Sequence, residues 1–113
     1  MRTLTSKVAL AALLLSISTG AFAESRYFPL SAIEDWQGQR FTVQRIEFLD
    51  EDSLERQNLE AWLDGNAGEI EQLQIAVRAN PGLREALAAQ SVQLNNVVAI
   101  SQALNGNFVV YLR

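Results

Sequence analysis

The first 23 residues decide how much of the chain is left to fold. Two positive charges, Arg2 and Lys7, precede an uninterrupted apolar run at 8–15, and the segment closes with Ala21-Phe22-Ala23. This order of charged, apolar and small residues is typical of a cleavable secretory signal peptide. The apolar run is much shorter than the about 20 residues that span a bilayer. We therefore predict cleavage after Ala23 and a periplasmic or secreted protein comprising Glu24–Arg113, with no stable membrane span.

The remaining chain must fold without disulfide bonds. The sequence contains no cysteine, although many exported domains of this size are held together by disulfides. The length allows one domain with a modest hydrophobic core. We predict an N-terminal arm at 24–40, in which Ser31 and Glu34 have capping-box spacing for a short helical turn, and a single α+β domain at 41–113.

The residue types absent from this part of the chain restrict its chemistry. There is no histidine, and once Lys7 is removed there is no lysine, so the usual general bases and transition-metal ligands are missing. Seven arginines then stand against thirteen acidic residues, which gives a net charge of −6. An acidic domain without a basic cluster is poorly suited to binding nucleic acid. We expect no cofactor and no enzymatic activity.

The first strand is predicted within 41–49, where apolar residues alternate. The pair Phe41/Val43 is out of phase with the pair Ile46/Phe48, because side chains alternate between the two faces of a strand. Either a β-bulge in the middle restores the phase, or the strand begins only at Arg45. The residue pattern does not decide between these two alternatives.

Three helices follow this strand. The first is expected to begin near Ser53 and to end at Gly65, since glycine is favoured just after a helix. The second runs from Glu69 to about Ala79, with apolar residues at helical spacing. The third begins at Asn80-Pro81, because asparagine is a favoured N-cap and proline is favoured at the next position.

A hairpin turn at Asn105-Gly106-Asn107 joins the last two strands. Its loop length is left open by the sequence. A loop with an odd number of residues places Val98 and Ile100 on the same face of the sheet as Phe108, because a one-residue slip reverses the faces. A loop with an even number of residues places Val97, Ala99 and Ala103 there.

The predicted fold is α+β, a small three-stranded sheet in the order β-ααα-ββ with the short helices packed on one face. We expect the first strand to run parallel to the second, through a right-handed crossover, and the last strand to lie in the middle. The helices should cover the face that carries Phe108 and Val110. Val109 and Tyr111 on the other face then need a cover, either the aromatic N-terminal arm or another molecule. With Trp36 of the arm, they form the candidate interaction face.

The acidic segment Asp50, Glu51, Asp52 and Glu55 is a candidate metal site. Carboxylate oxygens suit calcium, although the spacing is not that of an EF-hand loop. The alternative is helix capping, because Asp52 and Glu55 have capping-box spacing and carboxylates are favoured at a helix N-terminus. We weigh capping above calcium. Calcium or small-ligand binding remains the second functional hypothesis, and a hydrolase that uses two carboxylates is the third.

The C-terminal half of the chain resembles small exported bacterial domains of unknown function. This resemblance implies a bacterial, exported protein but brings with it neither an activity nor a site residue. Our leading hypothesis is a non-enzymatic module that binds a protein, with a second copy of itself among the candidates. The residues that carry the resemblance are Leu73-Gln74, Ala76, Asn80-Pro81, Leu83, Leu87, Val97-Val98-Ala99, Gly106 and Tyr111.

Overall fold

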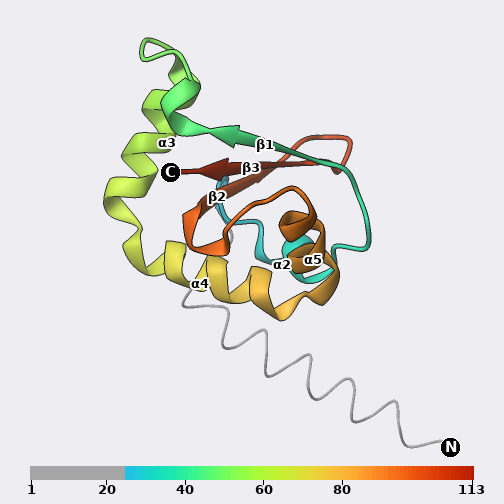
Figure 1. The fold of residues 1–113 in the computed structure, drawn as a ribbon. Helices are drawn as coiled ribbons and strands as arrows, with labels where there is room; N and C mark the ends of the chain where they lie inside the picture. The colour runs from blue at the N-terminus through green and yellow to red at the C-terminus, as the bar shows by residue number, and fades with distance from the viewer. Residues whose placement is uncertain (1–24) are drawn as a thin grey trace, which may run out of the picture.

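The computed structural model describes residues 25–113 as an α+β fold, as predicted (Figure 1). The predicted signal peptide at 1–23 lies outside the described residues. Within 25–113, no helix combines the length and the apolar character needed to cross a membrane. In chain order the elements are α2 (Leu30–Glu34), β1 (Phe41–Arg45), the 3₁₀ helix η1 (Ile46–Phe48), α3 (Leu54–Gly65), α4 (Ala67–Ala79), α5 (Pro81–Ala89), the 3₁₀ helix η2 (Leu94–Asn96), β2 (Val97–Gln102) and β3 (Phe108–Leu112).

The sheet has the order β1-β3-β2, with the last strand in the middle as expected. β1 runs parallel to β3, and β2 runs antiparallel to β3. The expectation that the first strand is parallel to the second was therefore wrong. The three helices and η2 return the chain to the end of the sheet where β1 finishes, since Arg45 and Val97 both pair with Leu112.

The first strand matches neither alternative proposed for it. β1 pairs regularly with β3 from Phe41 to Arg45 without a bulge, and the next three residues form η1. Ile46 and Phe48 are therefore not strand residues, which explains why they are out of phase with Phe41 and Val43. The bulge of this sheet lies in β2, between Val97 and Ala99.

The hairpin loop has an odd number of residues, 103–107, because Gln102 pairs with Phe108. Ile100 pairs with Val110 and packs in the same core as Phe108, which confirms the odd-length alternative for Ile100. The same alternative was wrong for Val98, which packs in the other core. The bulge between Val97 and Ala99 changes the register at the start of β2. Val97 therefore packs in the same core as Phe108, whereas Val98 faces the other core.

Two hydrophobic cores lie on the two faces of the sheet. On the first face, Phe108 and Val110 contact buried residues of α4 and α5, together with Phe28 and Ile33 from the N-terminal arm. This is the face that we expected the helices to cover. On the second face, Tyr111 packs against buried leucines of α3 and against Tyr27. α3 thus covers the opposite face from α4 and α5.

The helix boundaries follow the capping residues closely. Asn80 is the N-cap of α5, as predicted, and its side chain accepts the N–H of Leu83. α3 begins next to Ser53 as expected, but its N-cap is Ser53, which accepts the N–H of Arg56, and not Asp52 of the predicted capping box. α3 includes Gly65 as its last residue, with Asn66 as its C-cap, and α4 begins at Ala67, earlier than the predicted start at Glu69. In the arm, Pro29 is the N-cap of α2, in place of the capping box predicted at Ser31.

Candidate functional site

The predicted interaction face does not form one open surface. Tyr111 is only 3% exposed, and Val109 is half-buried beside it. The ring of Tyr27 meets that of Tyr111 edge-on, with 6.1 Å between the centroids. Trp36 packs against the first core, on the opposite side of the sheet. Of the two covers considered for the second face, the N-terminal arm provides one through Tyr27, and α3 completes it.

A hydrogen bond ties this buried face to the start of α3. The hydroxyl of Tyr111 donates to Oε2 of Glu55 over 2.7 Å. Burial, and then the hydrogen bond to this carboxylate, raise the pKa of Tyr111 to about 12. The hydroxyl of Tyr27 is also buried, but it has no protein hydrogen-bond partner among the described residues. One tyrosine on this face is therefore held by its hydroxyl and the other is not.

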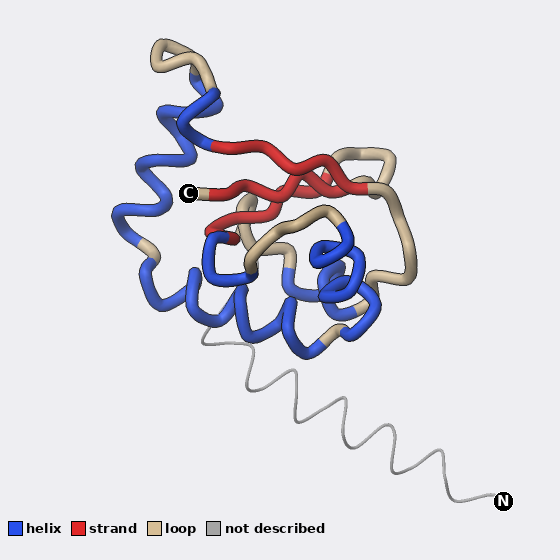
Figure 2. The backbone as a smooth tube through the Cα atoms, in the orientation of Figure 1, coloured by secondary structure: helices blue, strands red, loops and turns tan. Residues whose placement is uncertain are grey.

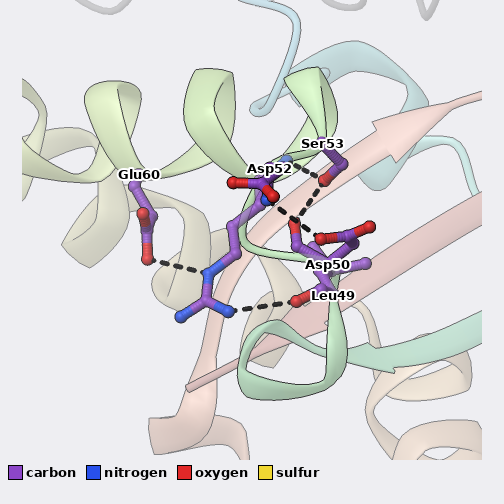
Figure 3. A network of polar contacts seen from close by, with 6 residues as sticks. Leu49, Asp50, Asp52, Ser53 and Glu60 are labelled. Atoms are coloured by element: carbon purple, nitrogen blue, oxygen red, sulfur yellow. Dashed lines mark hydrogen bonds and ion pairs between the residues drawn. The ribbon is translucent and has the colours of Figure 1, made fainter.

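The acidic segment forms a helix cap. Oδ1 of Asp50 accepts the N–H of Asp52 over 3.0 Å, and the Ser53 hydroxyl donates to the carbonyl oxygen of Asp50 over 2.7 Å (Figure 3). The same Ser53 oxygen accepts the N–H of Arg56, so Ser53 caps α3 in place of Asp52. Arg56 extends the network by donating to the Leu49 carbonyl and pairing with Glu60.

Two of the four acidic residues proposed as metal ligands are bound to different partners through their carboxylates. Glu55 turns to Tyr111, while the carboxylate of Asp50 accepts the backbone N–H of Asp52. Within residues 25–113, no group of three or more histidine, cysteine, aspartate or glutamate side chains is placed to hold a metal ion. The geometry of the segment therefore favours capping over calcium binding.

A groove beside η1 and α3 contains carboxylates and has a volume of about 360 Å³. Its three acidic residues are all exposed, and Glu60 is ion-paired with Arg56. A hydrolase of the kind considered above needs one sheltered carboxyl group as its acid. This groove does not offer one, so its geometry does not favour that reaction. It is lined by Ile46, Glu47, Arg56, Glu60, Leu63, Asp64 and Arg113.

The outer edge of β1 is the feature that sequence reasoning did not locate. In the described part of the chain no strand lies beyond β1, and Figure 2 shows no segment running along that edge. The carbonyl of Arg40 accepts the N–H of Phe108 over 3.0 Å, so it points into the sheet. Because backbone groups alternate along a strand, those of Phe41, Val43 and Arg45 point outward.

A second groove opens at the N-terminal end of β1, with a volume of about 330 Å³. The rings of Trp36 and Phe41 lie 6.3 Å apart in its wall. The side chain of Asn80, the N-cap of α5, donates to the Trp36 carbonyl over 3.2 Å and so ties this wall to α5. The groove is lined by Trp36, Gly38, Gln39, Arg40, Phe41, Ala86 and Gln90.

Exposed apolar side chains mark the other end of β1. Phe48 in η1 is 70% exposed and Leu54 at the start of α3 is 73% exposed. The guanidinium carbon of Arg45 lies 5.5 Å from the centroid of the Phe48 ring. β1 therefore has an open backbone edge with an aromatic-lined groove at one end and an exposed aromatic ring at the other.

Comparison with protein-family models, with curated proteins and with solved structures finds no match for this chain.

Proposed function

We propose that this chain is a non-enzymatic interaction module that binds an extended protein segment along the outer edge of β1. In this mode of recognition the added strand pairs with the backbone of the edge strand, and pockets beside it receive side chains. The observation that carries the proposal is the outward direction of the N–H and C=O groups of Phe41 and Val43, which no described segment pairs. Such unpaired rows are a template for another strand.

The flanks of β1 support this choice of surface. A partner strand gains affinity from backbone hydrogen bonds and specificity from side-chain pockets. The groove beside Trp36 and Phe41 is such a pocket, and Phe48 offers apolar area at the far end of the same strand. Apolar side chains that stay exposed next to an unpaired edge are a feature of interaction surfaces.

The proposal places this activity outside the cytoplasm. Its basis is the charged, apolar and small residue order of 1–23. Mass spectrometry of the protein isolated from cells that express the full chain tests this point. The mass of Glu24–Arg113 in the exported fraction supports export, and an intact chain that remains in the cytoplasm contradicts it.

A proline at an outward-facing position tests the binding mode. Val43→Pro removes the outward N–H, whereas Val43→Ala removes most of the side chain and keeps that N–H. Proline is tolerated on an edge strand where its nitrogen faces solvent. Tagged wild-type protein and both variants are used to capture partners from extracts of the expressing cells, and bound proteins are quantified by mass spectrometry.

The expected result is a set of proteins retained by the wild type and by Val43→Ala but reduced at least about tenfold with Val43→Pro, since several backbone bonds of about 1 kcal/mol are lost together. Circular dichroism checks that each variant is folded. Equal capture by folded Val43→Pro and Val43→Ala contradicts strand addition at β1.

A further inference from the structure

We infer that the strand received by β1 is β1 of a second copy of this chain. The inference rests on the proposed function and adds the identity of the partner. Its first support is the arrangement of the outward backbone groups. They belong to Phe41, Val43 and Arg45, so they are placed symmetrically about Val43 in a strand of five residues.

Two copies of β1 can therefore pair antiparallel around a twofold axis at Val43. In this register Val43 faces Val43 of the second copy, and Phe41 faces Arg45 of the second copy. An antiparallel hydrogen-bonded pair exchanges N–H and C=O groups in both directions. The outward N–H groups of Val43 and Arg45 then meet outward carbonyls of the other β1, which a one-residue shift of register would destroy. The carbonyl of Arg45, which faces the N–H of Phe41, is also the first acceptor of η1, because Arg45 is the N-cap of that helix.

The side chains in this register are also complementary. Phe41, Val43 and Arg45 share one face of the strand, because alternate residues point the same way. A twofold axis perpendicular to the sheet keeps equivalent faces together, so Arg45 of the second copy stands beside Phe41. Cross-strand neighbours of this kind are within reach of each other, and an arginine next to an aromatic ring is favourable.

The two ends of β1 become neighbours in the same arrangement. Because Phe41 faces Arg45 of the second copy, η1 of that copy, which carries Phe48, begins at the end of β1 where the groove containing Trp36 and Phe41 lies. The exposed ring of Phe48 thereby approaches an aromatic-lined groove of about 330 Å³. The twofold axis repeats this contact at the other end of the interface.

Charge complementarity supports the same register. Arg40 is exposed and, within 25–113, belongs to neither of the two ion pairs that the side chains make. Since η1 follows Arg45, η1 of the second copy, which carries Glu47, begins at the same end of the interface as Arg40. Glu47 is exposed and, among the described residues, forms an ion pair with Arg45 of its own chain alone. Each end of the interface therefore combines an unpaired arginine with an accessible carboxylate.

Sedimentation equilibrium of protein purified from cells that express the full chain measures the association. The wild type and Val43→Ala are expected to form dimers at micromolar concentration, and folded Val43→Pro is expected to raise the dimer dissociation constant at least tenfold. Phe48→Ser should raise it several-fold. Ile75→Ser is the matched control, because Ile75 is 49% exposed on α4, away from β1, and its loss should leave the dissociation constant unchanged.

Hydrogen exchange on the wild type provides a test that requires no variant. The amides of Phe41, Val43 and Arg45 should exchange more slowly as the protein concentration rises, whereas an amide that is already bonded within the monomer should not change. A wild type that remains monomeric, a dimer that is unaffected by Val43→Pro, or β1 amides that ignore concentration would each overturn the inference.

These results also separate the inference from the proposed function. If the protein is monomeric but captures other proteins through β1, as judged by Val43→Pro against Val43→Ala, then the interaction module stands and the second copy is ruled out as its partner. If neither association nor capture depends on β1, both are wrong.

Discussion

The two edges of the sheet are finished in different ways. At β2, Val97–Ile100 are all buried, and the outward N–H of Ile100 donates to the carbonyl of Tyr27 over 3.0 Å. At β1, Thr42 and Arg45 are exposed, and in the described chain no segment lies against the outer edge. The N-terminal arm therefore closes the edge that is distant from it in sequence and leaves open the strand that follows it directly.

The backbones of the two edge strands are kept from unwanted pairing in different ways. Edge strands are commonly guarded by being short and by carrying charged side chains. β1 has five residues and ends with Arg45, which limits indiscriminate pairing without blocking its backbone. The outer edge of β2 is instead covered by the N-terminal arm at Tyr27. We interpret the closed edge as structural and the open edge as functional.

The same substitution at the two edges should have unequal costs. Ile100→Pro removes the N–H that binds Tyr27 together with a fully buried side chain. We expect a loss of about 4 kcal/mol or more in the free energy of unfolding. Val43→Pro removes an outward N–H with no partner in the described chain, and should lower the same free energy by less than half as much.

Urea unfolding followed by circular dichroism measures both effects. Ile100→Ala is the control that separates the side chain from the hydrogen bond, because it keeps the N–H. Ile100→Pro must be less stable than Ile100→Ala for the bond to Tyr27 to matter. Equal destabilisation by Val43→Pro and Ile100→Pro would show that the two edges are not different.

A second contrast lies between the two tyrosines of the second core, Tyr111 and Tyr27. Tyr111→Phe removes the hydrogen bond to Glu55. Because the acceptor is a charged but exposed group, we expect the free energy of unfolding at neutral pH to fall by about 1 kcal/mol. Glu55→Gln keeps a neutral acceptor and should cost less. Thermal unfolding of the wild type and both variants checks this order, which would be contradicted if Tyr111→Phe had no effect.

The raised pKa of the Tyr111 hydroxyl predicts that the free energy of unfolding depends on pH at alkaline pH. The pKa of Tyr111 is raised to about 12 in the folded protein, above the value of about 10 for an unfolded tyrosine. The unfolded chain then loses its proton first as the pH rises. The stabilisation is complete below about pH 10 and is lost between about pH 10 and pH 12. Urea midpoints across this range should fall more steeply for the wild type than for Tyr111→Phe.

The sequence predicts those parts of the fold that depend on local chemistry. Ser53 and Asn80 were recognised as caps or cap-region residues because their side chains bond backbone groups only three residues away. The hydrophobic faces of the helices and of β3 follow from periodicity in the same way. The middle position of β3 was also expected, and the structure confirms it.

Other features depend on contacts between distant segments, which a single sequence does not encode legibly. The end of β1 was missed because an apolar residue every second position fits both a strand and the turn into η1. Glu55 was grouped with its acidic neighbours, although its partner, Tyr111, lies 56 positions later. The direction of β1 and the open edge depend on how three helices route the chain, so the candidate site became visible only in the structure.

Removing the hydroxyl of Tyr27 should have the smallest effect on the free energy of unfolding. It also tests how the N-terminal arm is held against the second face of the sheet. The backbone carbonyl of Tyr27 bonds Ile100, and its ring lies 5.7 Å from that of Trp62 and 6.1 Å from that of Tyr111. Its buried hydroxyl bonds no described protein atom. Replacing a buried polar group that lacks a partner with an apolar group is nearly neutral or stabilising.

We therefore expect Tyr27→Phe to change the free energy of unfolding by between zero and about +1 kcal/mol, opposite in sign to Tyr111→Phe. Tyr27→Ala should instead cost about 3 kcal/mol, because the ring is lost from the second core. Urea unfolding of the three variants side by side measures the signs directly. If Tyr27→Phe were as destabilising as Tyr111→Phe, the hydroxyl would be holding the arm in place, and the closed edge would depend on a side-chain hydrogen bond in addition to backbone pairing and ring packing.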